Sequence, residues 1–239
     1  MLSIFKKEIN SFFSSLIGYI VIGVFLLFMG AFMWVFPDYS ILNYGFATMH
    51  QLFDFAPWIF CFLIPAITMR SFAEETQSGT IELLATRPIT DFQIILGKFF
   101  ANWALVLIAL IPTLFYYYTV YQLGAPVGNI DAGEVAGSYI SLALLAGAFV
   151  AIGLFSSSLT NNQIVAFVLG IFLCFFFYMA FDFLSTLSSN DHLIELFGIN
   201  YHYNLLSRGA IDTRDVIYFM TFITGFLFFT KTALERRNW

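Results

Sequence analysis

Long runs of apolar residues alternate with short polar segments along the whole chain. Six of these runs are long enough to cross a bilayer, because a helix needs about 20 apolar residues to span the hydrocarbon. Backbone polar groups find no water there, and runs of this length exceed a barrel strand, so each is expected to be a helix. The expected spans cover residues 15–36, 53–69, 99–122, 135–159, 164–187 and 216–230.

The N-terminal segment predicts a helix of another kind. Within residues 2–13, Leu2 and Ile9 fall on an apolar side, whereas Lys6 and Lys7 lie largely opposite. Such a segment is typical of an amphipathic helix that lies in the lipid headgroups. It is expected to precede the first span.

Composition supports a membrane protein of the all-α class. Apolar residues make up 60% of the chain and charged residues only 10%, against roughly a quarter charged in soluble domains. No internal repeat or separate soluble segment is evident, so one membrane domain is expected to cover residues 1–239. The longest outer connection, residues 188–215, is expected to rest on the surface through a short helix near residues 193–197.

The positions of lysine and arginine predict the orientation, because cationic loops near span ends tend to stay in the cytoplasm. Six spans put both termini on one side, and eight of the ten cations fall there, leaving Arg208 and Arg214 opposite. Both termini are therefore expected to be cytoplasmic. The eight cations are Lys6, Lys7, Arg70, Arg87, Lys98, Lys231, Arg236 and Arg237.

The loop between the second and third spans holds most of the central polar residues. Gly79 interrupts the chain, and Thr80 can cap a new helical turn whose positive end suits Glu82. The apolar residues of this turn would form an exposed face, which is expected to seat in a groove of another protein. These apolar residues are Ile81, Leu83 and Leu84.

A second capping signal marks the start of the third span. Thr90 and Gln93 are spaced as a capping box, with Ile89 and Ile94 as the flanking apolar pair. Pro88 keeps the preceding turn from fusing with this helix. The short helical turn of the loop is therefore expected to be separate from the third span.

These loop residues resemble the permeases of type II ABC exporters, and the resemblance covers nearly the whole chain. The length, the Phe-rich spans and the Arg-Arg-Asn-Trp end are most similar to permease subunits of bacterial gliding-motility ABC complexes. The residues that carry the resemblance are Phe72, Glu74, Glu75, Gly79, Thr80, Glu82, Leu83, Leu84 and Pro88, followed by Gly97 and Lys98.

The resemblance implies a half-transporter in the bacterial inner membrane. Two six-span subunits, either two copies or a copy and a paralogue, would form the pathway, and two cytoplasmic P-loop ATPase subunits would drive it. An extracytoplasmic auxiliary subunit is a further implied partner; membrane lipid surrounds the chain, and nucleic acid is not expected. ATP and Mg²⁺ would be bound by the ATPase, with no cofactor in this chain.

The resemblance also assigns roles to particular residues. It places the coupling contact with the ATPase in the loop between spans two and three, and a smaller second contact in the turn between spans four and five. The coupling residues are Glu74, Glu75, Gly79, Thr80, Ile81, Glu82, Leu83 and Leu84. The second contact comprises Ser157, Ser158, Asn161 and Asn162.

The chain has no phosphate-binding loop of its own. Gly97-Lys98-Phe99 imitates the end of one, but position 92 is Phe where Gly is required, and Phe99 stands where Ser or Thr is required. No span presents a Ser/His, paired-carboxylate or metal constellation either. We therefore expect no catalytic residue and no ATP hydrolysis by this chain alone.

Several polar or small residues inside the spans suggest contacts between helices. Ala143, Gly147 and Ala151 recur every four residues, a spacing that favours close helix packing over a pore lining. Asn102 is expected to form an interhelical hydrogen bond. Cys61 lies inside a span, as does Cys174, and both are expected to be free thiols.

Two acidic residues lie near the outer ends of their spans, where the cost of a charge in the membrane is reduced. Asp54 and Asp182 could handle a substrate or ion in an outer vestibule, or could be solvated and paired at helix ends. The three histidines also lie on the outer side, but none has ligand spacing. No metal site is expected from them.

Other functions remain as alternatives at this stage. A drug, lipid or polysaccharide exporter of the same family would share every feature above. An ion-coupled secondary transporter would need charged or broken-helix sites at the midplane and inverted repeats, and neither is clear in the sequence. A membrane-bound enzyme is disfavoured by the missing catalytic constellations.

Overall fold

A computed structural model describes residues 1–80, 90–187, 194–209 and 211–236. Regular structure in these residues is entirely helical, and six segments are long and apolar enough to cross a membrane, which confirms the all-α prediction. The helices are α1 (Leu2–Ser14), α2 (Leu16–Gly30), the π-helix η1 (Ala31–Val35), α3 (Ile41–Tyr44), α4 (His50–Thr68), α5 (Arg70–Gln77), α7 (Asp91–Leu110), α8 (Thr113–Leu123), α9 (Ala132–Leu159), α10 (Gln163–Leu187), α12 (Ile199–Ser207) and α13 (Thr213–Glu235).

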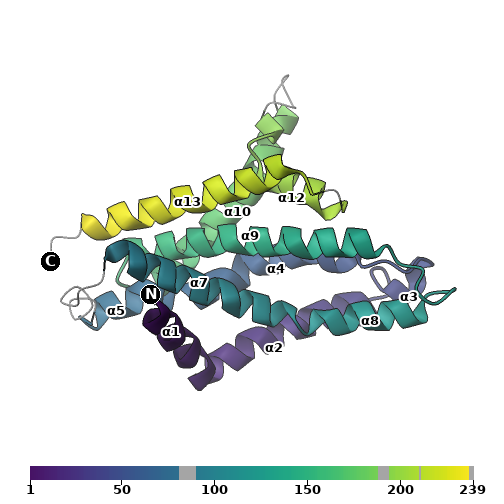
Figure 1. Cartoon of the computed structure of the whole chain (residues 1–239), viewed down its shortest axis with the longest axis horizontal. Coiled ribbons are helices and arrows are strands. Elements are labelled where there is room, and N and C mark those ends of the chain that lie inside the picture. The colour runs from purple at the N-terminus through teal and green to yellow at the C-terminus, as the bar shows by residue number, and fades with distance from the viewer. Residues whose placement is uncertain (81–89, 188–193, 210, 237–239) are drawn as a thin grey trace.

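The centre of the bundle is α9, which runs its full length with α4, α7 and α13 packed around it (Figure 1). Of its most apolar window, 78% is buried inside the protein, against 22% for α2 and for α10. A Cβ added at Gly153 of α9 would collide with Thr68 of α4. The two helices therefore cross closely at this glycine.

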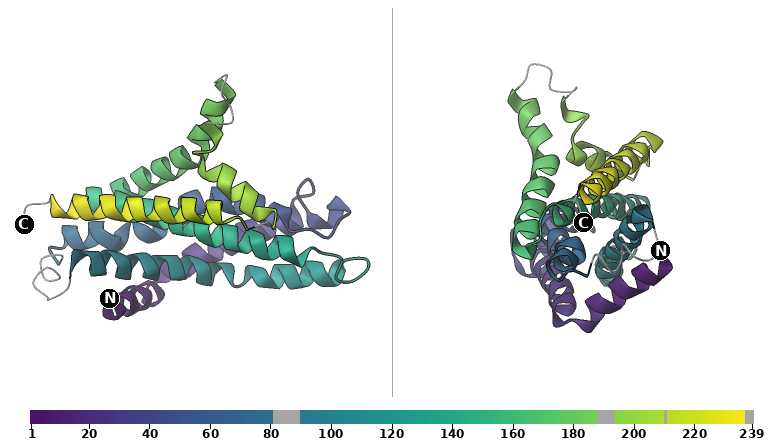
Figure 2. Two further views of the ribbon diagram at one scale, coloured as in Figure 1. Left: turned by 45° about the horizontal axis from the view of Figure 1, so that its top comes forward. Right: turned by 90° about the vertical axis from the view of Figure 1, so that its left-hand side faces the viewer.

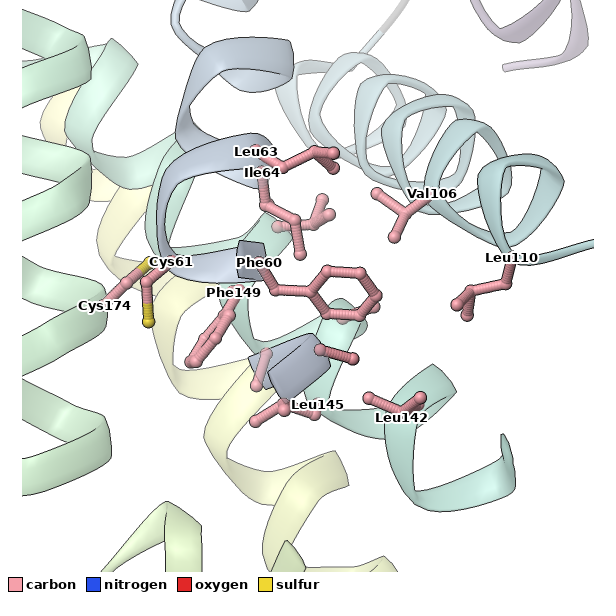
Figure 3. Close-up of a cluster of buried hydrophobic side chains, with 14 of the residues drawn as sticks. Phe60, Cys61, Leu63, Ile64, Val106, Leu110, Leu142, Leu145, Phe149 and Cys174 are labelled. Carbon is pink, nitrogen blue, oxygen red and sulfur yellow. The ribbon is translucent and has the colours of Figure 1, made fainter. Parts of the chain in front are cut away.

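Large apolar side chains from three helices fill the core between α4, α7 and α9. Phe60 of α4 and Phe149 of α9 both lie in this layer, near Val106 of α7 (Figure 3). Cys61 and Cys174 are buried free thiols at the side of the same core, as the sequence predicts.

The third span differs from the expected single helix over residues 99–122. It begins at Asp91, where the Thr90 side chain accepts a hydrogen bond from the backbone N–H of Gln93, as the capping signal predicts. It then breaks between α7 and α8, because Pro112 has no N–H to donate to the helical ladder. The Thr113 hydroxyl donates to the carbonyl of Leu110 across this break, at 2.6 Å.

The long connection after α10 is more deeply packed than a surface loop. Residues 194 and 195 are helical, at the place of the short helix expected near residues 193–197, and the next helix, α12, packs on α9. Ser138 and Ser141 of α9 donate hydrogen bonds to the carbonyls of Ser207 and Tyr203, at 2.8 and 2.9 Å. The Tyr203 hydroxyl in turn donates to the Phe53 carbonyl of α4, at 2.6 Å.

The predicted amphipathic N-terminal helix is present as α1. It lies across the end of the bundle rather than along it (Figure 2), and it contacts α7 and α2. Ile4 is its buried residue, and Gly97 of α7 makes room for it. Leu2, expected on the apolar side, is 76% exposed.

Candidate functional site

The helix α1, the end of α5, the start of α7 and the end of α13 lie at one end of the bundle, called here the terminal end (Figure 1). Four charged side chains meet there and link α1, α5 and α7; we call Lys7, Glu8, Glu75 and Lys98 the four-charge cluster. Lys98 Nζ lies 2.8 Å from Glu8 Oε1 and 2.9 Å from Glu75 Oε2. Lys7 Nζ donates to Glu75 Oε1 at 2.7 Å. The cluster joins three elements that are far apart in the sequence.

Lys98 is the buried centre of this cluster. Its side chain is only 1% exposed, and its ammonium also donates to the Ser71 carbonyl at 2.6 Å and lies over the Phe72 ring. A buried charge is tolerated when it is paired and hydrogen-bonded. Lys98 therefore fixes the start of α5 against α7 and α1.

Lys7 forms the solvent-facing edge of the cluster. Burial alone would lower the pKa of Lys7, but its hydrogen bond and ion pair with Glu75, helped by Glu8 and Glu74, outweigh burial and raise the pKa above its usual value. Lys7 therefore stays charged at neutral pH.

A serine of α9 separates α4 from α5. The Ser157 hydroxyl accepts hydrogen bonds from the backbone N–H groups of Phe72 and Ala73, at 3.0 and 3.1 Å, and donates to the Met69 carbonyl at 3.0 Å. A side chain inserted into the helical ladder is a recognised cause of a kink. Ser157 thus both caps α5 and anchors it to the central helix.

The expected interhelical hydrogen bond of Asn102 is confirmed. Its amide donates to the Ser71 hydroxyl of α5 at 3.0 Å and to the Lys98 carbonyl at 2.8 Å. Together with Lys98 and Ser157, Asn102 gives α5 polar contacts to both α7 and α9.

The residues assigned to ATPase coupling divide into three groups. Glu74, Gly79 and Thr80 are exposed, and Gly79 has a backbone φ of +69°, which favours glycine. Glu75 is buried, and its carboxylate faces Lys7 and Lys98 of its own chain. The remaining coupling residues lie outside the described part of the chain: Ile81, Glu82, Leu83 and Leu84.

The four residues of the second expected contact also fall into two groups, one buried and one exposed. Ser157 and Ser158 are fully buried, so their side chains face the interior of this chain. Asn161 and Asn162 are exposed beyond the end of α9. Of these four residues, only the two asparagines are accessible to a partner.

The small residues of α9 lie against different neighbours. Gly147 faces Ile223 of α13 and Trp103 of α7, and the Trp103 indole N–H donates to the Ala143 carbonyl at 2.8 Å. Ala151 is fully buried.

The two acidic residues considered for an outer vestibule differ in their surroundings. Asp182 of α10 accepts a hydrogen bond from the Asn200 amide of α12 at 2.5 Å. Asp54 of α4 is exposed. Of the two roles considered for Asp182, this contact corresponds to pairing at a helix end.

A buried histidine and aspartate were missed by the sequence analysis. His202 Nδ1 lies 2.6 Å from Asp215 Oδ1, and its Nε2 lies 2.9 Å from the Leu196 carbonyl, while the ring stacks on Tyr218 at 3.9 Å. This pair joins α12 to the start of α13. Within the described residues, no three His, Cys, Asp or Glu side chains group as a metal site.

Comparison with known proteins identifies the family. A family model described as "ABC-2 family transporter protein" matches residues 2–208, which include every helix from α1 to α12. No curated protein matches the chain. The six apolar segments and this match together make it a multi-pass membrane protein. The chain belongs to the ABC-2 transporter family.

Proposed function

We propose that this chain is a gliding-motility permease subunit whose motion is driven by a separate ATPase through residues 74–84. Membership of the ABC-2 family makes it a permease subunit of an ABC transporter and implies an ATPase partner. The proposal adds the motility role, a bacterial inner-membrane location with cytoplasmic termini, a second permease copy or paralogue, and an extracytoplasmic partner. ATP and Mg²⁺ would be held by the ATPase.

The observation that carries the coupling proposal is the attachment of α5 on three sides. Lys98 and Asn102 link it to α7, Ser157 links it to α9, and Lys7 links it to α1. A displacement of the segment that follows α5 would therefore move α1, α7 and α9 together with α5, instead of bending the chain at a flexible hinge.

Exposed residues in the second half of α5 and just after it supply a surface for the partner. Glu74 and Thr80 are accessible at the terminal end, and the apolar residues Leu83 and Leu84 follow in the sequence. An ATPase whose two nucleotide states bind this surface with different affinity could shift the permease between two conformations. The neutral turn with Asn161 and Asn162 is proposed as a second, smaller contact.

Substitution at Gly79 tests the coupling proposal. Proline holds φ near −65° and cannot adopt the positive φ of this turn, so Gly79→Pro should redirect the loop. We expect normal membrane insertion but loss of the change in ATPase rate that the permease imposes on its partner in liposomes. Gly45→Pro is the matched control, because Gly45 also has a positive φ but lies at the opposite end.

The double substitution Leu83→Asp with Leu84→Asp should have the same effect by removing the apolar face. Normal ATPase binding and regulation in both the Gly79 and the leucine variants would refute the coupling assignment.

The motility role is tested separately. A motility complex should retain a dedicated partner on the extracytoplasmic side of the membrane. An exporter should instead show an ATPase rate that rises when a drug, lipid or polysaccharide is added.

A further inference from the structure

A polar cavity of about 420 Å³ opens at the terminal end between α1, α4, α5 and α7. Two cations and three carboxylates line it, together with serine hydroxyls of α1 and α5. The charged residues are Lys7, Arg70, Glu8, Glu74 and Glu75. A cavity with both signs of charge and many hydroxyl groups suits a small zwitterionic group better than an anion.

Within the described residues, Arg70 is the cation of this cavity that has no ion-pair partner. Its Nε atom is buried without a hydrogen-bond partner in the structure, whereas Lys7 is paired with Glu75. Buried polar atoms are nearly always hydrogen-bonded, so an orphan donor on a cavity wall calls for a ligand. A guanidinium binds phosphate oxygens well because its N–H groups match their geometry.

An apolar groove of about 510 Å³ adjoins the polar cavity. Ala66 of α4 lines both of them. From there the groove follows α4 towards Phe55 and follows α2 from Ile20 towards Phe32, away from the terminal end. A polar cavity at a helix end beside an apolar groove along the spans has the arrangement of a lipid site.

We propose that the cavity and groove bind one phosphatidylethanolamine molecule, with its phosphate on Arg70, its ammonium beside Glu74 and an acyl chain between α2 and α4. A primary ammonium can donate hydrogen bonds to Glu74 and the serine hydroxyls, which a choline headgroup cannot. With Lys98 paired to Glu8 and Glu75, the charges around the cavity balance, which favours a zwitterionic headgroup over an anionic one. Glu74 also belongs to the surface proposed for the ATPase, but lipid binding needs no ATPase and can be measured without it.

Lipid retention by the purified full chain tests this proposal. The delipidated protein is incubated with equal amounts of phosphatidylethanolamine, phosphatidylcholine and phosphatidylglycerol of identical acyl chains, and bound lipid is counted by native mass spectrometry. We expect one phosphatidylethanolamine per chain. Equal retention of the three lipids, or a preference for phosphatidylglycerol, would overturn the proposal.

Substitution of the phosphate-binding residue gives the first variant arm. Arg70→Gln removes one charge-assisted hydrogen-bonding group, so phosphatidylethanolamine retention should fall about tenfold to a hundredfold. Arg236→Gln, an exposed cation after α13, should retain lipid as the wild type does. Wild-type retention by Arg70→Gln would show that the headgroup is not held there.

A groove variant distinguishes a lipid from a free headgroup-like phosphate. Val24→Trp fills the groove without touching the polar cavity, and it should also abolish retention. Ile217→Trp places the same bulk on an exposed position of α13 and should change nothing. A melting temperature like that of the wild type shows that each variant is folded. Full retention of phosphatidylethanolamine by Val24→Trp would contradict acyl-chain binding. A dimer in which a second copy of the chain covers the groove and no lipid is retained would also overturn the proposal.

Discussion

At the scale of single residues, Lys98 shows how a charge is accommodated at the edge of a membrane-spanning helix. It lies in the third span, yet each hydrogen-bonding direction of its ammonium meets an oxygen: Glu8, Glu75 and the Ser71 carbonyl. The four-charge cluster is electrically neutral, with two lysines and two glutamates. Its stability should therefore depend on keeping this balance rather than on any one ion pair.

The Lys98→Met variant tests this balance. Removing the lysine leaves the buried carboxylate of Glu75 and the partly buried one of Glu8 with one partner, Lys7, so unfolding in detergent should become easier by about 3–5 kcal/mol. The double variant Lys98→Met with Glu75→Gln restores neutrality and should recover part of the loss.

Lys231→Met is the control for Lys98→Met. Its ion pair with Glu235 is exposed and spaced i,i+4, so the loss should be only about 0.5 kcal/mol. Thermal melting of the purified variants measures all of these values. A double variant less stable than Lys98→Met would contradict the neutral-cluster account.

Residue-scale contacts were the least predictable from the sequence. Lys98 stood out only as part of a motif, because its partners Glu8 and Glu75 lie 90 and 23 positions away in the chain. His202 was weighed as a metal ligand and set aside, whereas in the fold it pairs with Asp215. Pairings of this kind depend on which helices become neighbours, and residue type alone does not specify that.

At the scale of elements, Ser157 makes α4 and α5 two helices rather than one. Its hydroxyl occupies the N–H groups of Phe72 and Ala73 that a continuous helix would pair with its own carbonyls. The junction is therefore held by α9, and α5 can respond to the loop beyond it while remaining attached to the central helix.

We predict that Ser157→Ala destabilises this junction specifically. Two buried N–H groups lose their acceptor, which should cost about 1–3 kcal/mol, and hydrogen exchange of the first turn of α5 should quicken. Ser156→Ala is the matched control, because Ser156 is equally buried but its hydroxyl bonds only to Ile152 within α9. Equal exchange in the two variants would show that Ser157 does not hold the junction.

Local signals predicted elements better than they predicted breaks within them. The Thr90 cap depends on neighbours in the chain, and it was read correctly. The α4–α5 break requires a hydroxyl 85 positions from Phe72, so no local pattern reveals it. The break at Pro112 was within reach of the sequence, because proline lacks the N–H that a continuous helix needs.

At the scale of the whole molecule, the run of apolar segments was sufficient to predict six spans and the all-α class. Which helix would be central was not evident, because α9 and α10 are similar in length and in apolar content. Small residues distinguish them: Gly147 and Gly153 let neighbours approach α9, whereas α10 exposes Phe172 and Phe183. An exposed apolar face of this kind fits lipid or a second permease subunit.

The proposed function requires a separate ATPase that binds residues 74–84. Purification of the tagged chain from its native membrane in mild detergent, with mass spectrometry of the proteins that accompany it, tests this requirement. We expect a P-loop ATPase without membrane spans, lost on Leu83→Asp with Leu84→Asp and retained in a control with Leu42→Asp at the opposite end. Recovery of the chain alone, unchanged by these substitutions, would refute the ATPase-driven mechanism and favour a self-contained secondary transporter.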